Sequence, residues 1–351
     1  MSVTPSSPNA AVPARGSGIV TRGLAYVPGL ALLLALGYAG KVIARYVPHT
    51  EYVLFAIALG MLISNTTGLP KIFVPGVKTY ELWLKTGIVF MGVGLALQNV
   101  AKIGGPGVIL VVVEILVSIV VAHYLAKAFK LKEKLGSLIG VGVGICGVSA
   151  IIGASGAIDA DEDDQGYAVA TILLFGAVMV FLLPLLGQTL GLSDKFFGFW
   201  AGVSVDNTAE TVATGMAFSE AAGKVATVVK LARNTLMGLV ILAMAVWYAQ
   251  RGMTAQVKNK GKFLWDRFPK FVLGFLAVSA LATFGFFAPA QVKALTGLSK
   301  WLFSMTFAGV GLSMRFADMK AGIKPFIVGC GVEAAVTLVN FFLVWWLIGM
   351  A

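Results

Sequence analysis

Two pairs of charged side chains lie within strongly apolar sequence. Asp206 and Glu210 are four residues apart, and Lys230 and Arg233 are three apart in the next apolar segment. At these spacings the members of each pair share one face of a helix. A charge inside a membrane is costly unless it is paired or hydrated, so all four residues are candidates for function.

Two interpretations of these charges stay open. In the first, the basic and acidic side chains form an ion pair between helices. In the second, Lys230 or Arg233 compensates an anionic substrate, while Asp206 or Glu210 binds a coupling ion, H+ or Na+. Each of two further apolar segments carries a lone acid, and these acids are candidates for coupling or for a structural role: Glu114 and Glu333.

Glycine is concentrated in two of the apolar segments. Residues 135–158 hold seven glycines, and residues 201–215 form a related stretch. Each glycine weakens a helix by about 1 kcal/mol relative to alanine, so this density predicts two broken membrane helices. The alternative is that small residues only allow close helix packing.

A broken helix offers an anion site, because the first amides of a half-helix lack an acceptor and the helix dipole adds positive charge. Hydroxyl and amide side chains at the breaks add donors. We therefore predict that the substrate-binding residues are Gly144, Cys146, Gly147, Ser149, Gly202, Ser204, Asn207, Thr208, Lys230 and Arg233.

The composition indicates an all-α polytopic membrane protein. Hydrophobic residues make up 58% of the chain and charged residues 12%, which lies outside the usual range of soluble domains. A helix of about 20 residues crosses a hydrocarbon core of roughly 30 Å. Windows of this length predict about eleven transmembrane helices, near residues 23–44, 52–69, 79–98, 104–127, 135–158, 166–190, 196–217, 221–248, 270–288, 298–315 and 324–349.

The chain divides into a tail and one membrane domain. Residues 1–21 are rich in Ser, Pro, Ala and Gly and contain no acidic residue, so we predict a disordered tail. Residues 22–351 form the predicted transmembrane domain. Its broken helices belong to a predicted core region, residues 135–245.

A weak internal repeat is also visible. The sequence GVGL begins at Gly92 and again at Gly309, and an apolar segment with a lone acid follows each copy. Residues 84–129 and 301–348 are therefore predicted to be inverted-topology repeats. Such repeats are typical of secondary transporters that alternate access around a midplane site.

The distribution of charge predicts the orientation, because loops that stay in the cytoplasm collect Lys and Arg. A cytoplasmic N-terminus gathers most basic residues on the inner side, including Lys132, Lys134 and Lys195. The acidic cluster at residues 159–164 then lies outside, and the C-terminus is periplasmic. The net charge of +11 is explained by this orientation and by contact with anionic lipid, so no nucleic-acid partner is expected.

Several classes of site lack support. The two cysteines, Cys146 and Cys330, lie in apolar segments, and the two histidines are not clustered with them. No metal site or other cofactor is therefore expected. No phosphate-binding loop of the GxxxxGK[ST] kind occurs, so direct use of ATP by this chain is not expected.

These motifs resemble the YeiH-type sulfate exporter family of bacterial membrane proteins. The resemblance rests on GVGICGVSAI from Gly142, YAVATILLFG from Tyr167, FWAGVSVDNTAETVATG from Phe199 and AGKVATVVKLARN from Ala222. It implies inverted repeats, a panel or dimer domain, and a core domain with crossed, broken helices. It also implies sulfate or a related sulfur oxyanion as substrate, and a homodimer.

The same resemblance marks three sets of residues in this chain. They are Gly144, Ile145, Cys146 and Gly147 in the first stretch, Gly202, Ser204 and Ala209 in the second, and Lys230 and Arg233 in the third. The chain departs from the family pattern at Gly144, at Asp206 with Asn207, and at Glu210. The last two changes add acidic character, so the substrate or the coupling ion can differ from the family's.

We predict a secondary active transporter of the bacterial inner membrane, not an enzyme, which moves a small anion by alternating access. Sulfate or a related sulfur oxyanion is the expected substrate. The alternatives are a proton- or sodium-coupled carrier of another small solute, such as an organic acid, and an anion channel. A membrane-embedded enzyme would need a nucleophile and base or a metal cluster, and a scaffold would not need buried charges of both signs.

Overall fold

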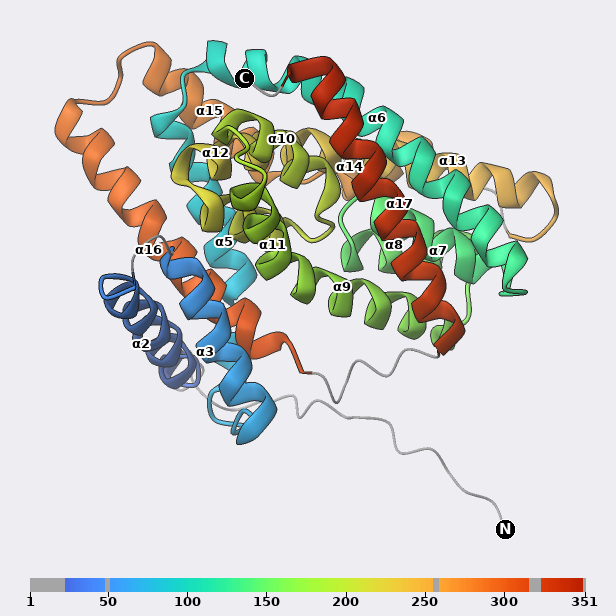
Figure 1. Cartoon of the computed structure of the whole chain (residues 1–351), viewed down its shortest axis with the longest axis horizontal. Coiled ribbons are helices and arrows are strands. Elements are labelled where there is room, and N and C mark those ends of the chain that lie inside the picture. Colours follow the sequence, from blue (N-terminus) through green and yellow to red (C-terminus); the bar gives the residue numbers. More distant parts are fainter. Residues whose placement is uncertain (1–22, 48–50, 255–258, 316–322, 350–351) are drawn as a thin grey trace.

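The protein is described from a computed structural model (Figure 1), over residues 23–47, 51–254, 259–315 and 323–349. Across these residues the regular structure is helical, as the sequence predicts. The predicted tail, residues 1–21, lies outside the described residues. Two groups of helices pack side by side, and we name them the peripheral group and the central group.

The peripheral group lies on the left in Figure 1. Its helices approach one another closely at glycines: a Cβ at Gly311 would lie 2.1 Å from the carbonyl oxygen of Ile57. Small residues allow such backbone contact between membrane helices. The group consists of α2 (Val27–Ala44), α3 (Tyr52–Thr66), α4 (Val74–Val77), α5 (Tyr80–Met91), the 3-10 turn η1 (Gly92–Gly94), α15 (Phe271–Thr283) and α16 (Pro289–Ser313).

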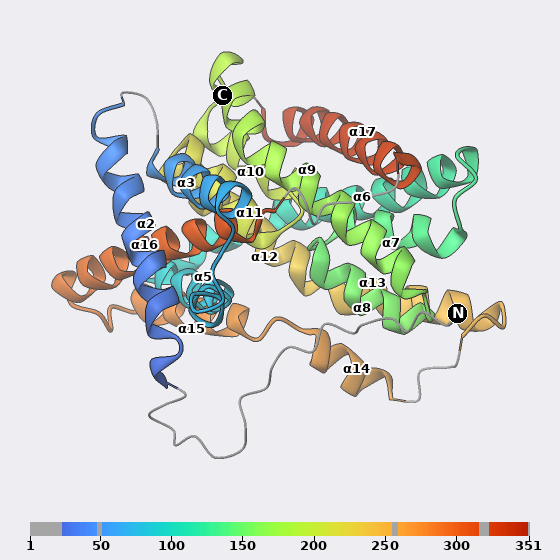
Figure 2. The same cartoon turned by 90° about the horizontal axis from the view of Figure 1, so that it is seen from below.

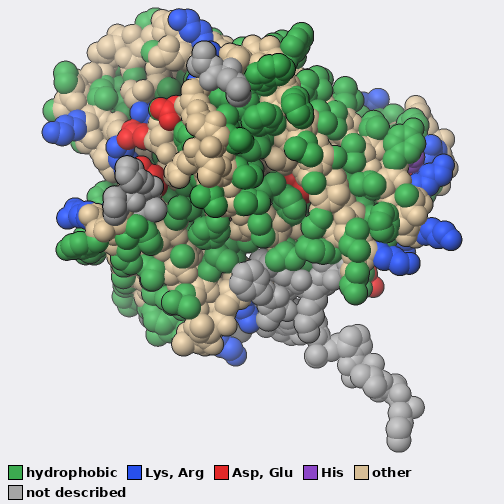
Figure 3. Space-filling model, in the orientation of Figure 1, with side chains coloured by type: hydrophobic (Ala, Val, Ile, Leu, Met, Phe, Trp, Pro, Cys, Tyr) green, Lys and Arg blue, Asp and Glu red, His purple; other side chains and the backbone are tan. Residues whose placement is uncertain are grey.

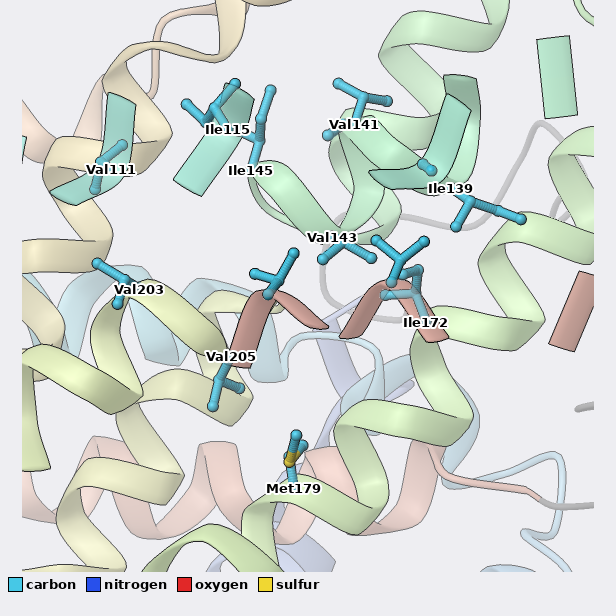
Figure 4. Close-up of a cluster of buried hydrophobic side chains, with 14 of the residues drawn as sticks. Val111, Ile115, Ile139, Val141, Val143, Ile145, Ile172, Met179, Val203 and Val205 are labelled. Atoms are coloured by element: carbon cyan, nitrogen blue, oxygen red, sulfur yellow. The ribbon is translucent and has the colours of Figure 1, made fainter. Parts of the chain in front are cut away.

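The central group contains both glycine-rich segments. Valine and isoleucine side chains from several of its helices form one buried cluster, part of which is drawn in Figure 4. The group consists of α6 (Leu97–Ala128), α7 (Glu133–Gly144), α8 (Val148–Ile158), α9 (Glu162–Thr189), α10 (Asp194–Ser204), α11 (Thr208–Phe218), α12 (Glu220–Thr235), α13 (Met237–Gln250) and α17 (Ile323–Ile348). The short helix α14 (Lys260–Arg267) packs on α13.

Among the described residues, five helical segments are long and apolar enough to cross a membrane. They are α2, α6, α9, the continuous run of α12 and α13, and α17. The face shown in Figure 3 is mostly hydrophobic, with Lys and Arg gathered near its edges. These features fit a protein that passes through a bilayer several times.

The prediction of two broken helices is confirmed. The first glycine-rich segment is interrupted between α7 and α8, where Gly147 has a φ of 64°. This left-handed backbone suits a glycine, because a side chain would clash there. The second segment is interrupted between α10 and α11, at residues 205–207.

The same two segments were predicted to cross the membrane, and that prediction is wrong. The half-helices α7 and α8 fold back into a pair, hairpin 1 (residues 133–158). Beside its open end, Lys132 Nζ lies 2.8 Å from Asp161 Oδ2, and Lys134 Nζ donates to the carbonyl oxygen of Asp159 at 2.7 Å. A segment whose ends lie this close together does not cross a bilayer.

The half-helices α10 and α11 form a second pair, hairpin 2 (residues 194–218). Ser219 Oγ donates to Asp194 Oδ1 at 2.6 Å, and the rings of Phe197 and Phe218 stack with their centroids 4.1 Å apart. Each half-helix has only 11 or 12 residues, about 17 Å of rise against a hydrocarbon core of roughly 30 Å. Hydropathy windows record apolar character but not a reversal of direction, and this explains the wrong prediction.

The predicted position of the acidic cluster at residues 159–164 is also wrong. Lys132 contacts both Asp161 and Asp164, so the cluster lies on the same side as the basic residues from which the prediction separated it. The Lys132 ammonium donates to Asp161 and lowers the pKa of that carboxyl group. The base of hairpin 1 is therefore a surface where opposite charges meet.

The helix α9 connects the two hairpins, and its length determines that they point in opposite directions. Its 28 residues rise about 42 Å at 1.5 Å per residue, enough to carry the chain from one side of a bilayer to the other. The hairpins therefore have their open ends at opposite ends of α9, and α7 and α8 lie to the right of α10 and α11 in Figure 2. Their tips meet between these ends.

The predicted inverted repeat stays a prediction. The first GVGL sequence lies at η1, between α5 and α6, and the second lies in the last turns of α16, before α17. The helices α6 and α17, which follow the two copies, pack against each other. Glu114 of α6 and Glu333 of α17 are both buried, and they lie close enough to interact electrostatically.

Candidate functional site

The breaks in the two hairpins leave backbone carbonyls without helical partners, and Lys230 satisfies three of them. This fully buried side chain of α12 donates from Nζ to the carbonyl oxygens of Ile145, at 2.7 Å, and Val205, at 2.8 Å. It also donates to the carbonyl oxygen of Asp206. The last carbonyls of a helix carry the negative end of its dipole, so a cation stabilises them.

Arg233, one turn further along α12, ties the same two hairpins together. Its Nε donates to the carbonyl oxygen of Gly144 at 2.9 Å. Its Nη1 donates to the carbonyl oxygens of Val203 and Val205 at 3.0 and 3.1 Å. The side chain is fully buried, and its planar fork reaches both breaks at once.

The remaining nitrogen of Arg233 pairs with acids from two other elements. Nη2 lies 3.1 Å from Glu114 Oε1 of α6 and 3.5 Å from Asp206 Oδ1 at the tip of hairpin 2. Glu333 of α17 lies within hydrogen-bonding reach of the Asp206 side chain. The two lone acids of the predicted repeat therefore converge on one arginine and one aspartate.

The cluster holds more acidic than basic groups. Glu114 Oε2 and Glu210 Oε2 have no hydrogen-bond partner among the described residues. Glu210 of α11 is buried against Gly176 of α9, where a Cβ would lie 1.9 Å from its Oε2. The acids therefore outnumber the two cations, and buried carboxylates in excess of their partners take up protons or cations.

The amide ends of the half-helices lie on the other side of the breaks. The helices α8 and α11 begin there, and Asn207 Oδ1 accepts from the Ala209 amide at 3.0 Å, capping one amide. Both helix starts line one cavity of about 600 Å³, together with residues of the peripheral group. Cavity residues from the hairpins are Cys146, Val148, Ser149, Ile152, Asn207, Thr208 and Ala209.

Four of the predicted substrate-binding residues line this cavity: Cys146, Ser149, Asn207 and Thr208. The others have structural contacts. Gly144 and Gly202 allow close packing on Ser118 and Val229, Gly147 forms the turn of hairpin 1, and Ser204 Oγ accepts from Asn340 Nδ2 at 3.2 Å. Lys230 and Arg233 bind the carbonyl ends, and Arg233 also pairs with Glu114 and Asp206. The geometry therefore favours contacts within the protein over direct contact with a substrate.

Sequence reasoning missed three basic residues of the cavity: Lys85, Arg267 and Lys270. Arg267 belongs to a segment that hydropathy assigns to a loop, and Lys270 begins the predicted span near residues 270–288. The fold brings both residues to the hairpin tips. Asn234 was also missed. It is buried, lines the cavity and donates to Thr208 Oγ1 at 3.0 Å.

A smaller cavity of about 150 Å³ lies at the other end of the site, near the base of hairpin 2. Its lining includes Glu51, Glu220 and Lys300. Lys300 Nζ lies 2.6 Å from Glu220 Oε2, an ion pair that joins α16 of the peripheral group to α12 of the central group. The two groups are thus tied together at this end and separated by the larger cavity at the other.

The comparisons with known proteins agree with a membrane setting. The family model described as conserved hypothetical protein 698 matches residues 28–329. The chain belongs to this family. No group of three or more His, Cys, Asp or Glu residues that could hold a metal ion occurs in the part of the chain that the structure describes.

Relatives named UPF0324 membrane protein align over most of their length. The protein from Nitratidesulfovibrio vulgaris is 32% identical over 321 residues, which is 87% of this chain and 89% of the relative. The protein from Clostridium tetani is 30% identical over 332 residues, or 90% of this chain and 96% of the relative. The Corynebacterium glutamicum relative is 30% identical over 315 residues, 89% of this chain and 90% of its own. All three relatives are named as membrane proteins.

Proposed function

We propose that the protein is a secondary active transporter that moves a small anion by alternating access. The observation that carries the proposal is that the amide ends of two opposed half-helices and several basic side chains line one cavity of about 600 Å³. Amide ends attract anions through unpaired N–H groups and the helix dipole. Sulfate or a related sulfur oxyanion is the substrate we propose.

The cations within the helices have a different role in this proposal from the one predicted from sequence. Lys230 and Arg233 hold the carbonyl ends of both hairpins, which leaves the amide ends available for the substrate. Buried charges at a break stabilise backbone that a bilayer cannot hydrate. The substrate then binds among Ser149, Asn207 and Thr208, on the cavity side.

The proposed placement is a bacterial inner membrane with a cytoplasmic N-terminus and a periplasmic C-terminus. Replacing two predicted crossings by two hairpins leaves the parity of the crossings unchanged, so the ends stay on opposite sides. The open end of hairpin 1, with Lys132 and Asp161, then lies at the cytoplasmic side. The open end of hairpin 2, with Lys195, lies at the periplasmic side. The larger cavity opens on the cytoplasmic side, since it extends along α8 from the tip toward the base of hairpin 1.

Coupling is assigned to the buried acids. Asp206, Glu210, Glu114 and Glu333 crowd around two cations, and the Oε2 atoms of Glu114 and Glu210 have no hydrogen-bond partner among the described residues. We propose that they bind H+ or Na+ during the cycle. The inverted repeat and a homodimer belong to the same proposal, supported by the convergence of α6 and α17 and by the family resemblance.

A second candidate substrate class is favoured by the size of the cavity. A volume of about 600 Å³ exceeds by many times the roughly 30 Å³ that one water molecule occupies. Leu84, Leu173, Met237 and Phe271 contribute apolar surface to its wall. An organic acid, with an anionic head group and an apolar tail, would use both kinds of surface, and a coupled carrier of such a solute is the alternative. A conduction pathway through the same cavity would instead make the protein an anion channel.

The test is counterflow of radiolabelled sulfate into proteoliposomes loaded with unlabelled sulfate. Sulfite, thiosulfate, taurine, phosphate and a short organic acid serve as competitors, and pH or sodium gradients are imposed separately. We expect uptake that requires trapped sulfate, responds to one of the gradients and is absent from protein-free liposomes. Folded protein that shows no counterflow with any anion contradicts the proposal, and unitary currents without counterflow indicate a channel.

A further inference from the structure

Arg267 has an unusual position for a residue at the end of a short surface helix. It closes α14, is about half buried, and lines the cavity beside the tip of hairpin 1. Its guanidinium lies over α8, where a Cβ at Gly153 would be 2.0 Å from Nη1. Its Cζ lies 4.8 Å from the centroid of the Phe263 ring.

The guanidinium of Arg267 lies at Gly153, one helical turn from the amide end of α8. Ser149 and Gly153 are four residues apart, so they share one face of the helix about 6 Å apart along its axis. Ser149 lines the cavity, as does Ile152 on the same face. The guanidinium and the amide end of α8 therefore approach the same cavity from adjacent positions.

The other two cations of the cavity already have partners. Lys270 Nζ donates to the carbonyl oxygens of Trp265 and Asp266 at 2.6 and 3.1 Å. Lys85 Nζ lies 3.2 Å from Glu81 Oε2. Among the described residues, no ion pair is formed by Arg267, and its five N–H groups suit two oxygens of one oxyanion at once.

We propose that Arg267 is the specificity-determining cation of the transport site, and that Gly153 is the seat that lets its guanidinium reach the substrate. The substrate class is an oxyanion that presents two oxygens on one side: a sulfate, a sulfonate or a carboxylate. The proposal rests on the proposed function, because it assigns to that cavity the group that binds the anion's charge. It differs from the sequence prediction, which assigned this role to Lys230 or Arg233.

A substitution at Gly153 tests the position of the Arg267 guanidinium without removing its charge. In Gly153→Ala the new methyl group occupies the position of the guanidinium and lies 3.0 Å from Ile241 Cδ1. Arginine is flexible at its far end, so the guanidinium moves away and the helix stays intact. Gly156→Ala is the matched control, because it lies on the same helix and its Cβ would meet nothing within 4 Å.

The experiment compares wild type, Arg267→Gln, Arg267→Lys, Gly153→Ala and Gly156→Ala in sulfate counterflow. Loss of a charged hydrogen bond raises the half-saturation concentration on the order of tenfold in Arg267→Gln and Gly153→Ala. Arg267→Lys falls between these and wild type, and Gly156→Ala matches wild type. Thermal unfolding in detergent, with and without sulfate, shows that each variant is folded and measures binding without transport.

The outcomes separate the two proposals. Wild-type counterflow with an unchanged half-saturation concentration in Arg267→Gln overturns the role of Arg267 and leaves the proposed function intact. A Gly153→Ala variant that behaves like Gly156→Ala overturns the role of the seat. If neither counterflow nor stabilisation by any oxyanion occurs in wild type, the proposed function and this inference both fail.

Discussion

Hairpin 1 and hairpin 2 meet at their tips but are held in different ways at their bases. Beside the base of hairpin 1 is an ion pair between Lys132 and Asp161, whose side chains are 62% and 68% exposed. The base of hairpin 2 carries stacked aromatic rings, of which Phe197 is fully buried. Exposed ion pairs contribute about 0–1 kcal/mol, whereas a buried aromatic side chain contributes several. The ion pair at the base of hairpin 1 therefore contributes less to stability than the stacked rings at the base of hairpin 2.

The tips, by contrast, share one anchor. Arg233 donates to the carbonyl oxygens of Gly144 in hairpin 1 and of Val203 in hairpin 2, and pairs with Glu114 and Asp206. Substitution at this position is the change with the largest expected effect on both hairpins. The differences between the hairpins then appear in substitutions that reach only one of them.

Arg233→Gln should lower the free energy of unfolding by about 3–5 kcal/mol, because it leaves buried carboxylates and carbonyls without their partner. The measurement is the thermal midpoint and the fraction of monodisperse protein after extraction in detergent. Lys293→Gln is the control, since Lys293 is exposed. Equal stability of Arg233→Gln and wild type would contradict the claim that Arg233 holds the tips of both hairpins together.

Phe197→Ala should destabilise hairpin 2 alone, by about 3 kcal/mol, through loss of a buried aromatic side chain. Phe197 stacks on Phe218 and also packs on Gly187 of α9. Hydrogen exchange should rise in residues 194–218 and stay near wild type in residues 133–158. Phe286→Ala is the control, because Phe286 is 71% exposed. Hydrogen exchange that rises equally in both hairpins would contradict the prediction that Phe197 stabilises hairpin 2 alone.

Gly147→Ala should destabilise hairpin 1 by about 1–2 kcal/mol, the cost of a side chain in left-handed backbone. The added Cβ would also lie 3.1 Å from Ile172 Cγ2. At the corresponding turn of hairpin 2, Asn207→Ala removes a helix cap and should cost about 1 kcal/mol. Thermal midpoints test both. A Gly147→Ala midpoint as high as that of Gly156→Ala would show that the turn does not require glycine.

Asp161→Asn should have the smallest effect, and the effect should depend on pH. The pKa of Asp161 is lowered by the hydrogen bond from Lys132. A lowered pKa stabilises the fold above the ordinary aspartate pKa, and the stabilisation is lost as pH falls through the lowered value. The midpoint difference from wild type should therefore be present at neutral pH and vanish in acid. Asp163→Asn, at an exposed neighbouring position, is the matched control for removing one carboxylate.

The position of the breaks could be predicted from sequence, because glycine density acts locally on helix formation. The direction of the chain after each break could not, since 24 apolar residues fit one crossing or a folded pair equally well. A signal was present: basic Lys132 and Lys134 precede the first segment and Asp159 and Asp161 follow it. Opposite charges at the two ends of an apolar segment are compatible with a hairpin whose ends pair.

Part of the lining of the cavity could be predicted for the same reason, because glycine density marks the breaks. Ser149, Asn207 and Thr208 belong to the breaks themselves, and they line the cavity. Arg267 belongs to a short helix distant in sequence, and only tertiary packing brings it onto Gly153. The buried cations were assigned to the substrate because a charge in a membrane indicates function. Here their hydrogen bonds go to backbone carbonyls, a need that becomes visible only once the hairpins are folded.

The most direct test of the opposed hairpins is the sidedness of single cysteines. Lys132→Cys, Asp161→Cys and Lys195→Cys are made separately in a chain whose Cys146 and Cys330 are replaced by Ala. A membrane-impermeant maleimide is then applied to intact cells with a permeable outer membrane and to inverted vesicles. Labelling of positions 132 and 161 from one side, and of position 195 from the other, is the predicted result. Labelling of positions 132 and 161 from opposite sides would show that the segment crosses the membrane and would contradict the hairpin architecture.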